Sequence, residues 1–336
     1  MGTEYYASKI ETLRDIFGAT NVDLGNNFIE VDHRRYPVID DVIVVLHPSQ
    51  WPVEVRNRVA ELTDSVGFSK SEEFARDIQF TFGKEWQRFS EILPSHKDEF
   101  YQYFDLLNVS TLQHQRVCDL GCGIGRWSYF LQEVCREIVL VDFSEAIFVA
   151  RTNLASASNA LFFMGDIKAL PFRTSFADLI ICLGVLHHLP TDALQEVRRL
   201  GRFAPRLLVY LYYALDNRPA YFRMLLGVVS SLRVGLSKIR NGTFRERFSW
   251  LITYSVYLPF VLLGKVLKPV GLASYIPLYE RYVGRSPKRI QQDVYDRFFT
   301  SIEQRFSRDE IMRLTDTFSQ VRVSPGIPYW HFICES

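Results

Sequence analysis

The stretch 117–127, with the sequence VCDLGCGIGRW, constrains the fold of this chain more than any other. Residues 116–120 are apolar enough for a buried strand, glycines follow at 121, 123 and 125, and 127–134 have the apolar spacing of a helix. Glycine lets the backbone turn sharply and approach a ligand closely, and the free N–H groups that begin a helix attract polar or anionic groups. We therefore expect a strand, a tight turn and a helix that together bind a ligand.

The glycine spacing distinguishes between two kinds of nucleotide site. A dinucleotide site has G-x-G-x-x-G, but Arg126 occupies the place of the third glycine here. The chain has D-x-G-x-G-x-G instead, beginning at Asp119. This pattern resembles motif I of class I S-adenosylmethionine (SAM) dependent methyltransferases. The resemblance implies SAM as the cofactor, bound by Asp119, Gly121, Cys122 and Gly123. A plain glycine turn between a strand and a helix is the alternative.

Two carboxylates further along the chain fit the same cofactor. Asp142 ends the apolar run 138–142, seventeen residues after Gly125, where a carboxylate can accept hydrogen bonds from a ribose diol. The family resemblance assigns it this role, and the alternative is a helix cap near residue 144. By the same resemblance, Phe143 packs on the adenine, Asp166 accepts from the adenine amino group, and the Ile167 backbone lies nearby. For Asp166, a turn residue is the alternative.

The segment 177–190, ADLIICLGVLHHLP, supplies the candidates for catalysis. It resembles the fourth strand of the family and the loop beyond it, so Leu183 and Gly184 are expected to line the methionine part of SAM. His187 occupies the place where related enzymes direct a side chain at the acceptor, and His188 follows it. Imidazole titrates near neutrality, which suits a general base. A structural role for both histidines is the alternative.

The alternation of strands and helices over 116–214 predicts a parallel sheet covered by helices on both faces. We expect strands at 116–120, 137–141, 160–164, 178–183, 206–213, 320–324 and 329–335. We expect helices at 126–135, 144–155, 191–201 and 307–318, the last one beginning at the N-cap Ser307. The expected fold class is α/β: a Rossmann-like, seven-stranded class I methyltransferase sheet with a helical insert and a small N-terminal extension.

Five segments are expected along the chain. They are a small N-terminal unit at 1–50, a helical lead-in over the cofactor at 51–110, the SAM-binding core at 111–216, a helical insert over the acceptor at 217–292, and the end of the core at 293–336. The run 34–46, RRYPVIDDVIVVL, resembles the end of a zinc-ribbon-like domain, but the usual cysteine pairs are missing. No metal is expected there, and a plain hairpin is the alternative. The aromatic segment 80–89 either covers the cofactor or packs on the core.

The insert 217–292 differs in charge from the rest of the chain. It has thirteen basic residues against two acidic ones, a net charge of +11, whereas the whole chain has +1. An apolar helical stripe over 221–239 is bordered by basic residues, as in helices that lie at a membrane surface. Residues 248–264 then run seventeen positions without charge, interrupted by Pro259. A membrane span needs about 20 apolar residues, so we do not expect this run to cross a bilayer.

These observations favour a SAM-dependent methyltransferase acting on a small molecule, such as a lipid-linked or nucleotide-linked sugar or another amphiphile. A non-catalytic protein of the same fold and an RNA methyltransferase are the alternatives. Aliphatic runs among the basic residues argue against a base-stacking nucleic-acid platform. No C-x-x-C pair is present and residues 1–14 lack an apolar export signal, so we expect no zinc and a cytoplasmic protein. A soluble insert packed on the sheet and one touching an anionic membrane both remain open, and the sequence does not indicate an oligomeric state.

Overall fold

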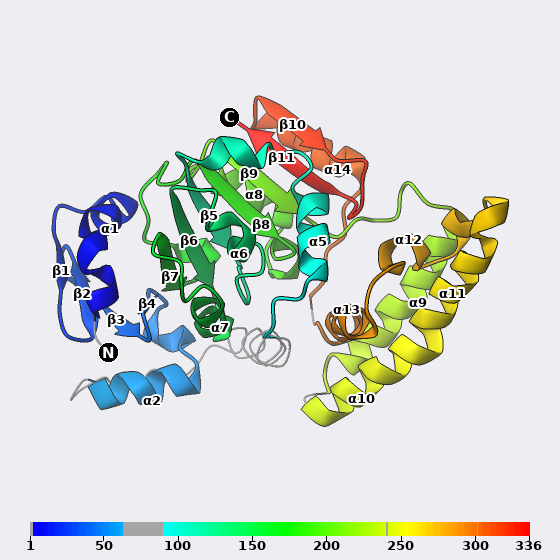
Figure 1. The fold of residues 1–336 in the computed structure, drawn as a ribbon, viewed down its shortest axis with the longest axis horizontal. Helices are drawn as coiled ribbons and strands as arrows, with labels where there is room; N and C mark the ends of the chain where they lie inside the picture. The colour runs from blue at the N-terminus through cyan, green and yellow to red at the C-terminus, as the bar shows by residue number, and fades with distance from the viewer. Residues whose placement is uncertain (1–2, 63–89, 240, 301) are drawn as a thin grey trace.

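The computed structural model describes residues 3–62, 90–239, 241–300 and 302–336, and the account below concerns these residues. Their strands form one sheet in the order β1-β2-β3-β4-β7-β6-β5-β8-β9-β11-β10. The predicted aromatic segment 80–89 lies outside the described residues. Figure 1 shows the sheet at the centre, the N-terminal strands at one edge and a helical lobe on the other side.

The predicted methyltransferase sheet occupies most of this order. Its strands β7, β6, β5, β8 and β9 pair in parallel, and β11 then pairs antiparallel to both β9 and β10. Apolar residues make up most of each parallel strand because helices cover both faces. The bounds are β5 Arg116–Leu120, β6 Glu137–Asp142, β7 Ala160–Met164, β8 Leu179–Leu183, β9 Arg206–Tyr210, β10 Gln320–Val323 and β11 His331–Glu335. The seven predicted strands are all present, and the antiparallel closing hairpin is confirmed.

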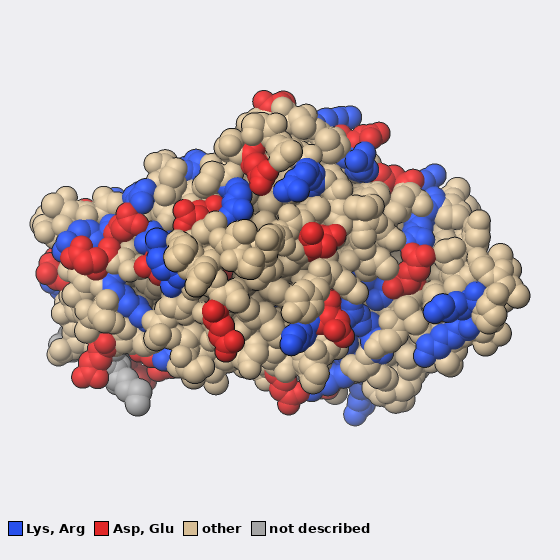
Figure 2. All heavy atoms as spheres, turned by 45° about the horizontal axis from the view of Figure 1, so that its top comes forward, with Lys and Arg blue, Asp and Glu red and all other residues tan. Residues whose placement is uncertain are grey.

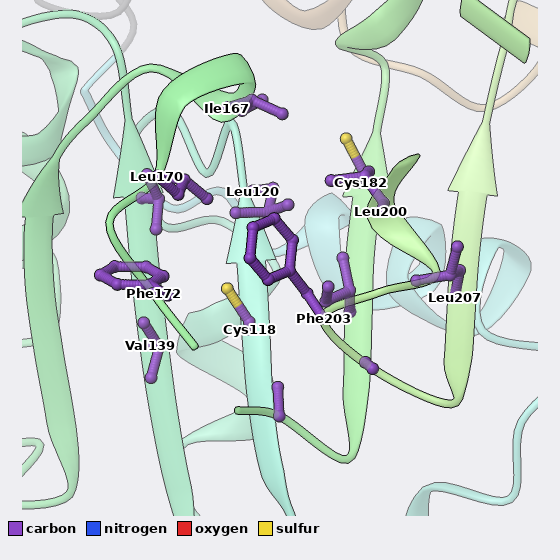
Figure 3. Packing of buried hydrophobic residues seen from close by; sticks show 14 of the residues in the cluster. Cys118, Leu120, Val139, Ile167, Leu170, Phe172, Cys182, Leu200, Phe203 and Leu207 are labelled. Carbon is purple, nitrogen blue, oxygen red and sulfur yellow. The ribbon is translucent and has the colours of Figure 1, made fainter. Parts of the chain in front are cut away.

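Two apolar clusters hold helices against the two faces of the sheet. On one face Cys118, Leu120 and Val139 pack toward Phe172 and Phe203 (Figure 3), and the helices α1, α8 and α14 belong to this side. On the other face lie α2, α5, α6 and α7. The helices are α1 Ile10–Phe17, α2 Val53–Leu62, α5 Ser95–Tyr103, α6 Ser128–Leu131, α7 Ala146–Asn153, α8 Ala193–Leu200 and α14 Arg308–Met312.

Two helices are shorter than the sequence indicates. The expected helix at 126–135 is helical only over α6, because the glycine turn extends to residue 127. The expected helix at 307–318 begins as predicted, with a reciprocal capping box between Ser307 and Glu310, but α14 gives way to a 3₁₀ turn at Arg313–Asp316.

The N-terminal residues extend the central sheet instead of forming a separate unit. A 3₁₀ helix at Thr3–Lys9 leads into α1, and the strands β1 Val22–Leu24, β2 Phe28–Val31, β3 Arg34–Ile39 and β4 Val42–Val44 follow. β4 pairs in parallel with β7 of the core. The buried Tyr6 hydroxyl donates to the carbonyl of Asp41 at 2.6 Å and also lies 3.3 Å from that of Phe162. The expectation of a separate unit at 1–50 is therefore corrected: these strands share a sheet and an apolar cluster with the core.

The insert forms a helical lobe with an apolar core of its own. It contains α9 Ala220–Leu236, α10 Gly242–Ile252, α11 Leu258–Leu267, α12 Tyr279–Tyr282 and α13 Pro287–Phe299. Tyr257, Tyr282, Ile290 and Phe299 are buried together at its centre. The ends of the insert meet, because the Phe306 N–H donates to Tyr212 and its carbonyl accepts from Ala214. α13 continues to Phe299, so the lobe extends past the predicted limit at 292.

A buried ion network fastens this lobe to the core. Glu99 of α5 is 1% exposed, and its carboxylate lies 3.0 Å from Arg289 Nε and 2.9 Å from Arg285 Nη1. Lys288 forms a more exposed pair with Glu91 on the same side of α13. The insert is thereby positioned against the helix that leads into β5.

A large part of the insert surface is apolar. α10, a π-helical turn at Thr253–Tyr257 and α11 join into one helical run, Gly242–Val270, which has 29 residues and is long and apolar enough to cross a bilayer. Exposed side chains on it include Trp250, Leu262 and Val266. Figure 2 shows the lobe at right as largely uncharged, interrupted by a strip of basic side chains. This helical run is longer than the uncharged segment 248–264, because the charged residues on both sides of that segment are also helical.

Candidate functional site

A cavity of about 790 Å³ lies where β5, β6, β8 and β9 end and the insert begins. In sheets of this kind the carboxyl ends of neighbouring parallel strands form the binding crevice. Residues of the glycine turn line one region of the cavity, and residues of α9, α10 and α13 line another. The site therefore has a part built by the sheet and a part built by the insert.

The glycine turn has the backbone geometry that its sequence predicts. Gly121, Gly123 and Gly125 have φ values of +73°, +54° and +73°, which side chains with a Cβ rarely adopt. A Cβ at Gly121 would lie 2.4 Å from a methyl carbon of Val185, and one at Gly125 would lie 2.7 Å from Leu154. The turn is thus held close both to the loop after β8 and to α7.

Asp142 is fixed at the edge of the cavity. Its Oδ2 accepts from the Gly123 backbone at 2.8 Å, and its Oδ1 accepts from the backbone and hydroxyl of Ser144 at 2.8 and 2.7 Å. Burial raises the pKa of this carboxyl, and the hydrogen bonds from Ser144 and Gly123 oppose that effect. A carboxylate oxygen accepts about two hydrogen bonds, so Oδ2 has remaining capacity for a ligand hydroxyl.

The other predicted cofactor residues are brought to the same cavity, with one exception. The lining includes Gly121, Cys122, Gly123, Asp142, Phe143, Asp166, Ile167, Leu183 and Gly184. Asp166 is half-buried and accepts from Gln50 Nε2 at 3.1 Å, a contact with the N-terminal segment that the motif does not reveal.

The exception is Asp119, which does not line the cavity. It is 1% exposed, and its Oδ2 accepts from the Ser128 hydroxyl at 2.6 Å. Burial, together with the nearby Asp142, raises its pKa to about 7. The prediction that Asp119 contacts the cofactor is corrected: it joins β5 to α6 behind the glycine turn and so positions that turn.

The two histidines differ in their access to the cavity. His187 has no exposed surface and stacks on Tyr212 with ring centroids 3.9 Å apart, and it is absent from the cavity lining. Burial, followed by the neighbouring His188 and Arg305, lowers its pKa well below the ordinary value. The prediction that His187 faces the acceptor is therefore wrong. His188 lines the cavity, and its Nδ1 lies 2.8 Å from the carbonyl oxygen of Ile302. Nδ1 therefore holds the proton of the neutral ring, and Nε2 is the basic nitrogen.

Several lining residues were not predicted from the sequence. Arg126 and Trp127 end the glycine turn, Tyr210 is the last residue of β9, and Tyr212 lies just beyond that strand. Residues at or just beyond the carboxyl end of a parallel strand are expected at the binding crevice, so their positions in the sequence could have identified them. Tyr103 reaches the cavity from α5, which local sequence does not indicate.

A family comparison agrees with this site. Residues 117–202 match the model of the methyltransferase domain family. The match includes the glycine turn, Asp142, Asp166 and the segment with both histidines. These residues form a class I SAM-dependent methyltransferase domain. Proteins of this class take SAM as the methyl donor.

Solved structures of methyltransferases are among those to which the chain is similar. A magnesium protoporphyrin IX methyltransferase from Synechocystis with bound S-adenosylhomocysteine is 18% identical, with 84% of this chain and 93% of that chain covered and a TM-score of 0.36. Phosphoethanolamine N-methyltransferase 1 from Haemonchus contortus is 19% identical, with 40% and 32% covered and a TM-score of 0.34. A SAM-dependent methyltransferase from Aquifex aeolicus is 20% identical, with 38% and 70% covered and a TM-score of 0.32. The match thus spans about a third of the Haemonchus protein. No curated protein sequence matches the chain.

The cavity beside this methyltransferase domain fits SAM on structural grounds. Asp142 would hold the ribose, Asp166 and Phe143 would hold the adenine, and the turn at 121–123 would lie against the cofactor. Leu183 and Gly184 would lie against the methionine portion at the end of β8. The position of the Asp142 carboxylate at the edge of the cavity, fixed by Gly123 and Ser144, supports this fit most directly.

Proposed function

We propose that the protein transfers a methyl group from SAM to an amphiphilic small molecule. The observation that supports this most strongly is the continuity of one cavity from the SAM residues into an apolar groove of the insert. Its volume, about 790 Å³, is within the range of sites that enclose small ligands. An acceptor in the groove would have its reactive end near the donor, which is the arrangement that methyl transfer needs.

The apolar groove has the properties of a binding surface for an alkyl or isoprenoid chain. No residue of α9 is buried, although the helix is largely apolar. Leu225 and Leu232 of α9 line the cavity yet are 47% and 56% exposed. Phe248 and Val256 line it from the facing run. Covering this face with an alkyl chain would remove apolar surface from water at about 25 cal/mol per Å².

SAM supplies the electrophilic methyl group, so the protein has to position the acceptor, exclude water and, for a hydroxyl acceptor, remove a proton. Tyr212 and His188 lie together beside the end of β8, with ring centroids 5.4 Å apart. His188 is the proposed base, acting through Nε2. His187 supports Tyr212 from behind by stacking on it.

The test is to incubate the protein with methyl-labelled SAM and a total lipid extract, and then to separate organic-soluble from water-soluble products. We expect label in the organic-soluble fraction, and much less of it with Asp142→Ala at limiting SAM, because that variant removes the ribose contact. Label confined to water-soluble products would refute the amphiphilic acceptor. SAM binding with no labelled product in any extract would favour a non-catalytic role.

We further propose that the outer face of the insert contacts an anionic membrane on its cytoplasmic side, where an amphiphilic acceptor would be found. Exposed Leu262 and Val266 lie next to exposed Lys265 and Lys268 on α11 and the turn after it. Apolar residues interleaved with lysine are typical of helices that lie in an interface. The opposite side of the same run packs on α13, and its Arg245 and Thr253 are buried, which favours a surface position over a span.

Vesicle flotation tests this contact. We expect the protein to float with vesicles that contain phosphatidylglycerol and to be released by high salt, because salt screens the attraction of lysines to lipid. Val266→Glu should reduce flotation. Val53→Glu, an equally exposed valine on α2, is the matched control. Recovery in the soluble fraction under every condition would refute the membrane contact and leave the acceptor proposal unaffected.

A further inference from the structure

Guanidinium groups dominate the charged wall of the cavity. The arginines that line it are Arg126, Arg218, Arg281, Arg289, Arg297 and Arg305. Beside these arginines the lining has the carboxylates Glu280, Asp293 and Asp296, whereas Asp142 and Asp166 line the cofactor region. Most of these residues belong to α12, to α13 or to the segment that follows α13.

Some of these arginines are neutralised within the wall. Arg218 pairs with Glu280, and Arg289 pairs with Asp293 and with Glu99 behind it. Neither needs a ligand to balance its charge. Asp296 is occupied differently, since its carboxylate accepts from the hydroxyl of Tyr212 at 2.6 Å.

Of Arg297 and Arg305, only Arg305 forms an ion pair within 4 Å among the described residues. Arg305 Nε lies 2.7 Å from Glu303, whereas the described contact of Arg297 is with the face of Tyr212, 5.5 Å from the ring centroid. The guanidinium of Arg305 lies 5.2 Å from the same ring. Burial and the proximity of Arg297 lower the pKa of Arg305, whereas Glu303 raises that of Arg297. Two guanidinium groups thus flank Tyr212 with one acidic partner.

Arg281 adds a third incompletely neutralised cation. Its Nη2 lies 3.9 Å from Asp293 and 3.4 Å from the Tyr103 hydroxyl. Its Nη1 is buried and has no hydrogen-bond partner within the described residues. A buried cation without a full set of partners is costly, and an oxyanion that accepts several N–H bonds would offset that cost.

We propose that Arg281, Arg297 and Arg305 form an anion subsite that binds a phosphate group of the amphiphilic acceptor. The inference rests on the proposed function and specifies its substrate class. Guanidinium groups suit this ligand because their fixed N–H geometry matches the oxygens of a phosphate. The subsite is next to Tyr212 and His188, and its cavity continues into the apolar groove. A phosphorylated head near the donor and a chain along α9 would fill both regions.

Calorimetric titrations with three probes test the proposal on the protein saturated with S-adenosylhomocysteine. The probes are decyl phosphate, decyl glucoside and inorganic phosphate, with both alkyl compounds kept below micelle formation. We expect decyl phosphate to bind at least tenfold more tightly than decyl glucoside, since a charge-assisted contact is worth about a factor of ten or more. Inorganic phosphate should compete weakly with decyl phosphate; if it binds as tightly, the subsite serves a free phosphate compound and not a lipid.

Arg297→Gln is the decisive variant, because Arg297 has no ion pair within 4 Å in the described structure that its loss would break. We expect it to reduce the preference for decyl phosphate about tenfold without changing the affinity for S-adenosylhomocysteine or the unfolding midpoint. Arg247→Gln, at an exposed position on α10, is the matched control. Equal affinity for both alkyl probes, or an unchanged preference in Arg297→Gln, would overturn the anion subsite. If neither alkyl probe binds, the amphiphilic acceptor fails as well.

Discussion

Replacing Glu99 by glutamine should separate the insert energetically from the core. The wild-type carboxylate is 1% exposed and lies within 3.2 Å of both Arg289 and Arg285, with Arg126 at 3.9 Å. Glutamine keeps the volume but removes the anion beside these buried guanidinium groups, which leaves Arg289 with Asp293 alone. Removing one partner of a buried ion pair costs about 3–5 kcal/mol, so we expect a loss of that size in the free energy of unfolding.

Urea unfolding followed by circular dichroism measures this loss. Glu91→Gln is the control, because Glu91 pairs with Lys288, which like Arg289 belongs to α13, but this pair is exposed. We expect the urea midpoint of Glu91→Gln to equal that of the wild type. A double-mutant cycle that combines Glu99→Gln with Arg289→Met should show strong coupling in the free energy of unfolding. The double variant should be more stable than the sum of the two single losses predicts. A Glu99→Gln protein as stable as the control, or an additive cycle, would refute the reasoning.

The same contact predicts a pH dependence. Burial tends to raise the pKa of Glu99, but Arg289 and Arg126 outweigh it and hold that pKa well below the ordinary value of 4.5. The stabilisation is therefore complete above about pH 4.5 and is lost as the pH falls toward the folded-state pKa. We expect the stability difference between wild type and Glu99→Gln to shrink in that acidic range, and a constant difference would contradict the assignment.

Three further predictions concern the domain core. Asp142→Ala should weaken S-adenosylhomocysteine binding about ten- to a hundredfold by calorimetry, because a charge-assisted hydrogen bond is lost; an unchanged Kd would exclude the ribose role. His188→Ala should lower turnover by about 10²–10⁴ with cofactor affinity retained, and full activity would mean that no base is needed. The pKa of Asp119 is raised to about 7, so the folded state disfavours its ionisation. The wild type should therefore lose up to about 4 kcal/mol of stability relative to Asp119→Asn as the pH rises from about 4 to about 7. A stability difference between the two proteins that stays constant over this pH range would contradict the prediction.

The parallel strands could be predicted because each is a short apolar run bounded by turn residues. The glycine turn after β5 could be predicted as well, because it depends only on the residues that form it. The addition of β4 to the edge of β7 could not, since it depends on contacts such as Tyr6 with Phe162, more than 150 residues apart. Sequence spacing identified residues most of which line the cavity. It did not reveal which side chains face inward.

The histidines illustrate that limit. His187 and His188 are adjacent in a 3₁₀ turn, Leu186–His188, and their order of burial is decided by the packing of Tyr212, which lies beyond the next helix and strand. The arginines of the insert show it again. Their charge is plain in the sequence, but the burial of Arg281 and Arg289 depends on α5, nearly 190 residues earlier. Electrostatic environment is a tertiary property, so it could not be derived from the local pattern.

Photo-crosslinking tests the central claim, that one cavity joins the cofactor site to an alkyl-binding groove. The probe is decyl phosphate with a diazirine at the end of its chain, added with S-adenosylhomocysteine, and mass spectrometry of the digested protein locates the crosslinks. We predict labelling within 225–236 and 248–260, lost when unlabelled decyl phosphate is in excess. Labelling restricted to the outer face at 262–272, or unaffected by the competitor, would contradict the account.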